Sequence, residues 1–281
     1  MTRLLTKHWI AVILGLWLFN TAPASSEDNW PYGEFRESTY LLDQSIVIIS
    51  WDTPSGRERL QRSKYNYDYF QLAHNFQPQL NPLYCGIASS VIVLNSMRLT
   101  KGSIPNQKAI EINRPKALGG GLLNYPSYSQ LTLLGDKTDP VKPRAIIELK
   151  NIHAPKNKLD PGLTLKQLSG ILKAYGASVQ IHYADKSPLD GPDTFRHKLK
   201  NILRDSTHFI IVNFHGKSMG APTDGHITPI GAYDEKTDSV LLLDVAGYLN
   251  PWYWVPVEHL YWAMHTKDGE NYRGYVIVSD N

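Results

Sequence analysis

The 281-residue chain contains a single cysteine, Cys85. One cysteine excludes an intramolecular disulfide, so the stability of the fold must come from packing. The sequence also lacks a CxxC pair and the Cys/His spacing of a structural zinc site, and we therefore expect no metal site. A lone thiol is either a small buried hydrophobe or a group kept for its reactivity.

A strong excess of charge of one sign is missing as well. The sequence has 29 Lys and Arg against 26 Asp and Glu, a formal net charge of +3, and no basic block. This balance argues against nucleic acid as a partner. The hydrophobic content of 42% is sufficient for a packed core, and the length suits one large domain.

Apolar runs long enough to span a bilayer are also absent. The longest run, Trp9 to Phe19, has eleven residues, follows Arg3 and Lys7, and precedes the small residues of Ala22-Pro23-Ala24. This is the anatomy of a cleaved secretory signal rather than an anchor. We therefore expect a signal peptide at residues 1–24, a mature chain of residues 25–281 without a membrane span, and a periplasmic or secreted protein.

The remaining pattern predicts a fold of the α+β class. Residues 100–160, rich in Pro, Gly, Lys and Asn, suggest a partly irregular insertion. Thr164 and Gly176 bracket one amphipathic helix as its cap and terminator. The predicted helices lie near residues 63–72, 85–97, 165–175, 193–203 and 257–264, and the predicted strands near 45–50, 178–183, 208–214, 226–233, 239–245 and 274–279.

Cys85 stands where a nucleophile would be activated. Asn81-Pro82 favours a loop, so the apolar helix opens near the thiol, and the positive end of a helix favours negative charge. Gln79, six residues upstream, can supply a side-chain amide that forms an oxyanion hole together with the backbone N–H of Cys85. Alone, Gln79 would be read as a solvated loop residue and Cys85 as a core residue.

A cysteine nucleophile needs an imidazole and a group that orients it. His226 begins one strand of a predicted hairpin with its turn near residues 235–238, and Asp244 ends the partner strand. The numbers of paired residues should then add up to about 470 or 473, which makes His226 and Asp244 neighbours across the strands. The carboxylate would fix the ring tautomer while the other ring nitrogen faces Cys85.

This order of Gln, helix-opening Cys, His and Asp resembles the papain-type cysteine proteases, and more closely the phytochelatin synthase family, also called glutathione γ-glutamylcysteinyltransferases. The Cys-Gly-Ser-Cys-Trp signature of papain is absent. The resemblance covers residues 76–97 and nearly all of 162–278. It is carried by the stretches FQPQLNPLYCGIAS, GLTLKQL, FRHKLK, IIVNFHG, GHITPIGAYD, LLLDVAGYLNPWYWVPVEHLYWAM and RGYVIV.

The resemblance implies a papain-like fold with a helical lobe around a central nucleophile helix and an antiparallel sheet lobe, and it makes residues 25–281 the catalytic domain. It assigns Cys85 as nucleophile, His226 as base and acid, Asp244 as orienting group and Gln79 as oxyanion donor. It also matches Asp268 and Arg273 to an acidic residue and an arginine that bind the γ-glutamyl end of the substrate. Without it, that pair would be read as an exposed ion pair in a turn.

The implied reaction starts from glutathione. A γ-glutamylcysteinyl thioester would form on Cys85 with release of glycine, and water or a second glutathione would take the acyl group to give γ-glutamylcysteine or phytochelatin. No cofactor is required, although heavy-metal thiolates of the substrate could take part. The expected partners are glutathione and its peptides, and a homodimer is left open.

Two departures from the family bear on the acceptor. The family usually carries an arginine where this chain has Gly216, and a basic residue in the segment that here reads Gly247-Tyr248-Leu249. The Cys-rich C-terminal region of the plant enzymes is also missing from the sequence. Two other functions stay open: a peptidase or amidase of the same clan, and a non-catalytic periplasmic thiol- or metal-binding protein.

Overall fold

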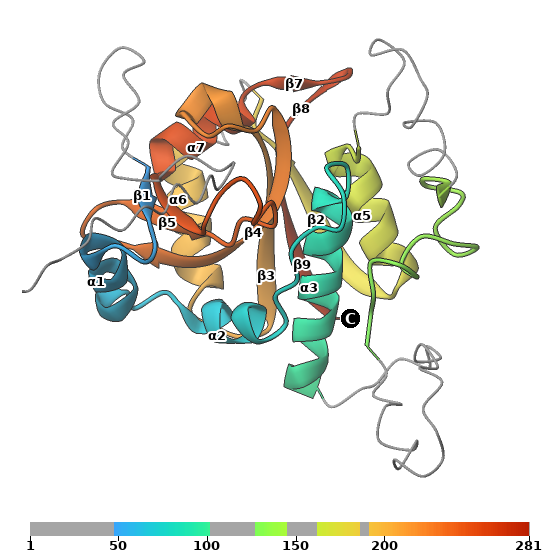
Figure 1. Cartoon of the computed structure of the whole chain (residues 1–281), viewed down its shortest axis with the longest axis horizontal. Coiled ribbons are helices and arrows are strands. Elements are labelled where there is room, and N and C mark those ends of the chain that lie inside the picture. The colour runs from blue at the N-terminus through green and yellow to red at the C-terminus, as the bar shows by residue number, and fades with distance from the viewer. Residues whose placement is uncertain (1–47, 102–126, 145–161, 186–190, 281) are drawn as a thin grey trace, which may run out of the picture. The chain divides into compact units, whose positions relative to one another are not determined.

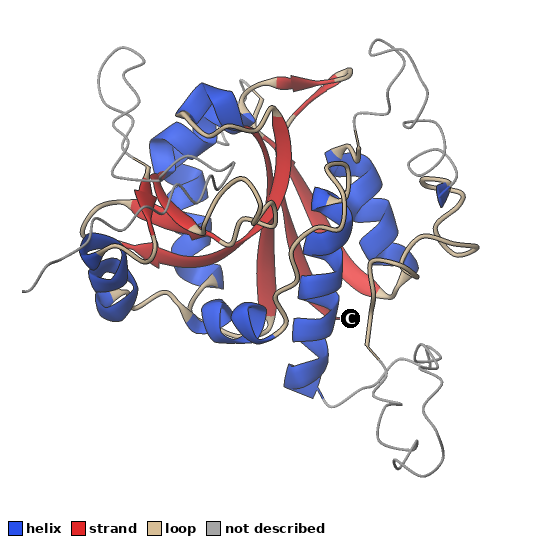
Figure 2. Ribbon diagram, in the orientation of Figure 1, coloured by secondary structure: helices blue, strands red, loops and turns tan. Residues whose placement is uncertain are grey.

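The structure, a computed structural model, describes residues 48–101, 127–144, 162–185 and 191–280. Its centre is a seven-stranded sheet in the order β1-β6-β5-β4-β3-β9-β2, in which every neighbouring pair is antiparallel. Figures 1 and 2 show this sheet between two groups of helices. The α+β class and the antiparallel sheet predicted from the sequence are confirmed.

The strands of the sheet are β1 (Ile49–Ser50), β2 (Ala177–Tyr183), β3 (His208–His215), β4 (Gly225–Asp234), β5 (Ser239–Leu242), β6 (Tyr253–Pro256) and β9 (Gly274–Asp280). A separate hairpin is formed by β7 (Lys267–Asp268) and β8 (Asn271–Tyr272). The helices are α1 (Pro54–Arg62), α2 (Tyr67–His74), α3 (Cys85–Lys101), α5 (Leu165–Ala174), α6 (Pro192–Ile202) and α7 (Val257–Met264), with a short 3-10 turn, η3 (Gly216–Met219).

Both faces of the sheet are buried, and the alternation of side chains along each strand divides them between two cores. In β3, Phe209 and Ile211 face the core that contains α3 and α5, whereas Ile210 and Val212 face the core that contains α6 and α7. Because both faces of β3 are buried, its sequence is a nearly continuous run of apolar residues. The helix that begins at Cys85 thus packs directly on the sheet.

The two helices behind the site follow from local sequence signals. α3 is buried over its first thirteen residues, Cys85 to Met97, as its apolar sequence predicts. At α5, Thr164 and Gln167 form a reciprocal capping box, and Gly176, the predicted terminator, adopts a left-handed conformation with φ +87°. α3 and α5 lie side by side in Figure 1 and share one core.

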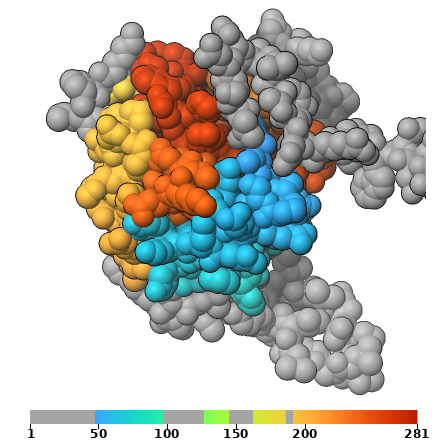
Figure 3. Space-filling model, turned by 90° about the vertical axis from the view of Figure 1, so that its left-hand side faces the viewer, coloured from blue at the N-terminus to red at the C-terminus, as the bar shows by residue number. Residues whose placement is uncertain are grey.

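The first part of the described chain packs against the β4–β5 hairpin. Figure 3 shows α1 and α2, blue to cyan, beside the orange hairpin segment. Arg62 holds Asp234 at the hairpin turn by two hydrogen bonds of 2.9 and 2.6 Å. The sequence reading missed α1, although Thr53 caps it and Pro54 occupies its first turn, and placed the second helix at 63–72 rather than 67–74. It also missed β6 and the β7–β8 hairpin.

The β4–β5 hairpin was predicted correctly, and its pairing next to the turn follows one of the two expected sums, 473, rather than the sum of 470 that would pair His226 with Asp244. Asp234 pairs with Ser239 and Tyr233 with Val240, and a bulge between Ile230 and Ala232 then shifts the pairing by one residue. Continued beyond Ile230 and Leu242, this register places Thr228 opposite Asp244. His226 and Asp244 are therefore diagonal rather than direct neighbours, and Asp244 lies just beyond the end of β5.

Some predictions fall outside the described residues: the signal peptide at 1–24, the first residues of the strand near 45–50, and much of the insertion at 100–160. Within that insertion, residues 127–143 form turns and bends, as expected for an irregular segment. In the described parts of the chain, no helix combines the length and apolar character needed to cross a membrane.

Candidate active site

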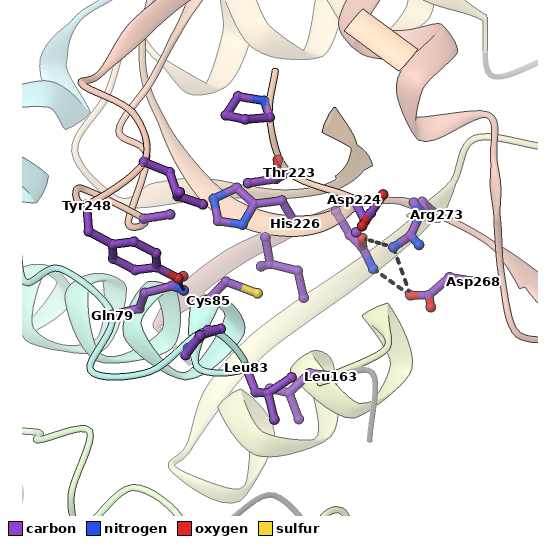
Figure 4. Close-up of a pocket in the computed structure, with 17 residues that line it drawn as sticks. Gln79, Leu83, Cys85, Leu163, Thr223, Asp224, His226, Tyr248, Asp268 and Arg273 are labelled. Carbon is purple, nitrogen blue, oxygen red and sulfur yellow. Dashed lines mark hydrogen bonds and ion pairs between the residues drawn. The ribbon is translucent and has the colours of Figure 1, made fainter. Parts of the chain in front are cut away.

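Five of the six predicted site residues line one cavity of about 530 Å³: Gln79, Cys85, His226, Asp268 and Arg273. The sixth, Asp244, is fully buried behind His226. Figure 4 shows the thiol and the imidazole in the middle of the cavity, with Gln79 at one end and Asp268 and Arg273 at the other. Residues more than 190 positions apart in the sequence thus meet at one place.

Cys85 is the first residue of α3 and is 8% exposed. The first helical hydrogen bond runs from the N–H of Ala88 to the carbonyl of Tyr84, at 2.7 Å. The N–H of Cys85 therefore belongs to the opening turn, where backbone donors have no acceptor within the helix. Such a donor beside the thiol is suited to binding an oxyanion.

The opening turn of α3 is fixed against β4. The Ser89 hydroxyl lies 2.8 Å from the carbonyl oxygen of Cys85 and 3.1 Å from that of Ile227, the residue after His226. A side chain at Gly86 would bring its Cβ to 2.9 Å from Leu163 Cδ1. The same Cβ would lie 3.2 Å from Ile227 Cδ1, so glycine at this position allows α3 to approach Leu163 and β4 closely.

His226 is oriented as the sequence predicts. Its Nε2 lies 2.7 Å from Asp244 Oδ1, both side chains are almost completely buried, and its other ring nitrogen remains for Cys85. Asp244 also accepts hydrogen bonds from the Ala246 N–H at 2.7 Å and from Asn250 Nδ2 at 3.1 Å. These bonds fix the carboxylate, and through it the imidazole plane.

The electrostatics of this cluster favour a charged imidazole. Burial of the ring acts to lower its pKa, but the charge and hydrogen bond of Asp244, followed by those of Cys85, outweigh burial and raise the pKa of His226 to about 10. An imidazolium of this kind beside the opening turn of a helix stabilises negative charge on the sulfur. The arrangement is suited to nucleophilic catalysis by cysteine.

Gln79 lies opposite the imidazole and is 6% exposed. Its backbone N–H donates to the Val245 carbonyl at 2.8 Å, and its side-chain Nε2 donates to the Tyr248 hydroxyl at 2.8 Å. This anchoring differs from the solvated loop residue that Gln79 would be when considered alone. Its amide lines the same cavity as Cys85, where an oxyanion donor is needed.

Asp268 and Arg273 form a polar group at the other end of the cavity. Arg273 Nη1 lies 3.4 Å from Asp268 Oδ2, and their side chains are only 13% and 14% exposed. Asn213 joins them, since it donates to Asp268 at 2.9 Å and accepts from Arg273 at 2.7 Å. The alternative of an exposed ion pair in a turn is therefore wrong.

The backbone next to His226 makes room for this group. A Cβ at Gly225 would lie 2.9 Å from both Nη1 and Nη2 of Arg273, so the guanidinium rests where a larger residue would not fit. Arg273 Nε is buried and has no hydrogen-bond partner among the described residues. Arg273, which lines the cavity close to His226, therefore keeps one donor that is not used by the described residues.

Sequence reasoning missed three residues of this site: Asn213, Tyr248 and Asn250. Asn213 had a signal, because it is the one polar residue in the apolar run FIIVNF of a predicted strand. Tyr248 was considered only as part of the segment Gly247-Tyr248-Leu249 that lacks a basic residue, and Asn250 only as part of a stretch that carries the family resemblance. In the described parts of the chain, no group of three His, Cys, Asp or Glu side chains could hold a metal ion.

Comparisons with known proteins give the family to which the sequence is similar. The family model of phytochelatin synthase matches residues 40–115 and 124–275. The chain is 28% identical over 213 residues to glutathione gamma-glutamylcysteinyltransferase 3 of Lotus japonicus, and 24% identical over 253 residues to the glutathione gamma-glutamylcysteinyltransferase of Schizosaccharomyces pombe. These matches cover 75% and 88% of this chain but 37% and 52% of the relatives, so the chain spans about a third to a half of their length.

The proton on His226 can be tested directly. By NMR of protein with 15N-labelled histidine, the His226 ring should be doubly protonated at pH 8 and should lose its proton only near pH 10. Asp244→Asn removes the carboxylate charge, so the pKa should fall and the ring should be neutral at pH 8. The His226→Gln variant identifies the signal, and a neutral wild-type ring at pH 8 would contradict the assignment.

The same shift sets the sign of a stability effect. The folded-state pKa of about 10 lies above the ordinary value of 6.5. The contribution of the charged ring to the free energy of unfolding is therefore complete below about pH 6.5 and is lost as the pH rises through about 10. In Asp244→Asn this dependence should shrink.

Proposed function

Because the chain belongs to the phytochelatin synthase family, we propose that it cleaves glutathione through a γ-glutamylcysteinyl thioester on Cys85, releases glycine, and passes the acyl group to water or to a second glutathione. The observation that carries this proposal is the cavity itself. It brings a cysteine paired with an imidazole within reach of a buried aspartate and arginine that suit an amino-acid end group.

We also propose that the fold is papain-like. The support is the relation between α3 and the sheet. Cys85 begins a buried helix, His226 lies on β4 of the antiparallel sheet packed against that helix, and Asp244 lies just beyond the end of the adjacent β5. The chain order Gln79, Cys85, His226, Asp244 is that of the papain-type enzymes. The proposed catalytic domain is residues 25–281.

In the first half-reaction, the sulfur of Cys85 attacks the carbonyl carbon of the cysteinyl–glycine amide. The carbonyl oxygen becomes negatively charged, and the Cys85 N–H and Gln79 Nε2 stabilise it. His226 donates its proton to the glycine nitrogen as the C–N bond breaks, which leaves a thioester and free glycine. In the second half-reaction, the neutral imidazole takes a proton from water or an incoming amine as that group attacks the thioester carbonyl. The C–S bond then breaks, which releases the acyl product and restores the thiolate of Cys85 beside the imidazolium.

The polar group at the far end of the cavity suits the γ-glutamyl end of glutathione, which carries an ammonium and a carboxylate. Asp268 would pair with the ammonium, and Arg273, with its unused buried Nε–H, would bind the carboxylate. Asn213 holds both side chains in place. The proposed reaction needs no metal ion bound to the protein. Heavy-metal thiolates of glutathione would enter as substrate.

The side of the cavity where an acceptor would bind differs from the family pattern. A Cβ at Gly216 would lie 2.1 Å from Thr223 Oγ1, so this backbone leaves no room for an arginine there. At Gly247 a Cβ would meet only Pro78 Cβ, at 3.8 Å, so the second cation is absent although space exists. A second anionic glutathione therefore finds fewer cationic groups, and we propose that hydrolysis dominates over transfer.

We further propose that residues 1–24 are a cleaved secretory signal and that the mature protein is periplasmic or secreted. The support is the sequence of charged, apolar and small residues at the start of the chain.

Acylation of Cys85 is the first test. Intact-protein mass spectrometry of enzyme quenched during turnover of glutathione should show a γ-glutamylcysteinyl adduct on Cys85, and Cys85→Ala should show neither adduct nor activity. His226→Ala should not turn over glutathione. Activity that survives in Cys85→Ala would refute the mechanism.

Binding of the γ-glutamyl end can be tested at Asp268. The Asp268→Asn variant should require about tenfold more glutathione to reach half of its maximal rate, because a charged hydrogen bond is lost, whereas the variant of an exposed residue, Asp136→Asn, should behave as wild type.

Processing of the N-terminus is the second test. After expression with an intact export pathway, N-terminal sequencing of the purified protein should give Ser25 as the first residue. A variant with Asp in place of Ala24 should retain the full-length chain, because the small residue at the cleavage site is lost. Recovery of wild-type protein that begins at Met1 would show that the segment is not a cleaved signal.

The ratio of products is the third test. Wild-type enzyme should give γ-glutamylcysteine and glycine as main products, with phytochelatin minor, rising at high glutathione and depending little on cadmium. Gly247→Arg should raise the phytochelatin share, because it restores a cation where space exists, and Gly247→Met controls for size. Phytochelatin in excess from wild type, or a cadmium requirement, would show that other residues bind the acceptor.

A further inference from the structure

Tyr248 contacts the proposed oxyanion donor directly. Its hydroxyl lies 2.8 Å from Gln79 Nε2, and both residues line the cavity that contains Cys85. Gln79 Oε1 is buried without a hydrogen-bond partner in the described parts of the chain. Within the described parts of the chain, the hydrogen bond of the Gln79 side-chain amide is therefore the one to the Tyr248 hydroxyl. Figure 4 shows the two side chains meeting beside the thiol.

The backbone around Gln79 is fixed without Tyr248. Gln130 bridges the residues on either side: its Oε1 accepts from the Leu80 N–H at 3.0 Å and its Nε2 donates to the Pro78 carbonyl at 2.9 Å. The Gln79 N–H is held by Val245. These bonds leave the plane of the side-chain amide undetermined, because the last torsion of glutamine has a broad energy profile. The direction of the amide needs a partner of its own.

Tyr248 is itself held by the residues that orient His226. Asp244 accepts from the Ala246 N–H and from Asn250, and the Leu249 N–H donates to the Ala246 carbonyl at 2.7 Å. The loop of residues 244–250 is thereby folded around the carboxylate. The backbone that carries Tyr248 therefore has a fixed position relative to the imidazole.

We propose that Tyr248 is a positioning residue that orients the Gln79 amide toward the carbonyl oxygen of an acyl group on Cys85. A primary amide nitrogen carries two hydrogens. One donates to the Tyr248 hydroxyl, and the other is then held toward the cavity, ready for the oxyanion. This inference rests on the proposed cysteine chemistry and adds the residue that keeps its oxyanion hole preorganised.

The test is a double-mutant cycle on glutathione cleavage. Tyr248→Phe keeps the ring and removes the hydroxyl, and should lower kcat about tenfold with KM changed less than about twofold, because an interaction made in the transition state is weakened. Gln79→Ala should lower kcat by about a hundredfold or more. Since Tyr248 acts through Gln79, the double variant Gln79→Ala/Tyr248→Phe should have the same kcat as Gln79→Ala alone.

Three results would overturn the inference: an unchanged kcat in Tyr248→Phe, an effect on KM alone, or an equal further loss in the Gln79→Ala background, which would mean that Tyr248 contacts the reacting atoms itself. Tyr67→Phe, an exposed tyrosine on α2, is the matched control and should be silent. Thermal unfolding checks that each variant is folded. If Tyr248→Phe is not, Tyr248→Leu takes its place in the cycle.

A second substrate separates this inference from the proposed function. Acylation of Cys85 by p-nitrophenyl acetate, corrected with Cys85→Ala, uses the oxyanion hole but not the Asp268 and Arg273 group. If glutathione is not cleaved while this acylation falls about tenfold in Tyr248→Phe, the proposed substrate is wrong and the positioning role stands. If acylation is insensitive to Tyr248→Phe, the positioning role is wrong whatever the substrate.

Discussion

The site depends on the buried carboxylate of Asp244. A charge removed from water is costly unless it is paired and hydrogen-bonded, and Asp244 meets this need with His226, the Ala246 N–H and Asn250. The same bonds that stabilise the carboxylate therefore set the imidazole plane and fold the loop that follows β5. That loop carries Tyr248, and Tyr248 holds Gln79. One buried charge thus orders His226 and Gln79, the proposed base and the proposed oxyanion donor, together.

The sheet supplies the rigidity that such a site requires. Because both faces of β3 and β4 are covered, the strands that carry Asn213 and His226 cannot shift without disturbing two cores. α3 is pinned to β4 through Ser89, so the thiol and the imidazole belong to one packed unit. At the other end of the cavity, the close contact between Gly225 and Arg273 places the proposed γ-glutamyl pocket one residue from His226.

The differences from the family pattern are concentrated around the acceptor side and have a common physical meaning. Gly216 is enclosed by Thr223, and Gly247 leaves a space without a charge. The neighbouring Tyr248 contributes a neutral hydroxyl that accepts a hydrogen bond from Gln79, the proposed oxyanion donor. The proposed first half-reaction keeps its residues, whereas the two cationic positions expected from the family pattern are glycines. This difference is the basis of the proposal that hydrolysis dominates over transfer.

The sequence by itself determined what depends on local chemistry: the helix that opens at Cys85, the capping box of α5, the β4–β5 turn, and the α+β class. It also identified Gln79, His226 and Asp244 by their types and order, and Asp268 and Arg273 only through a resemblance. Tertiary structure decided the rest. The bulge near Gly231 changed the strand register, Asn213 joined Asp268 to Arg273, and Tyr248 reached Gln79 across 169 positions. Caps and turns act over a few neighbouring residues, whereas these contacts exist only where the packed sheet brings distant segments together.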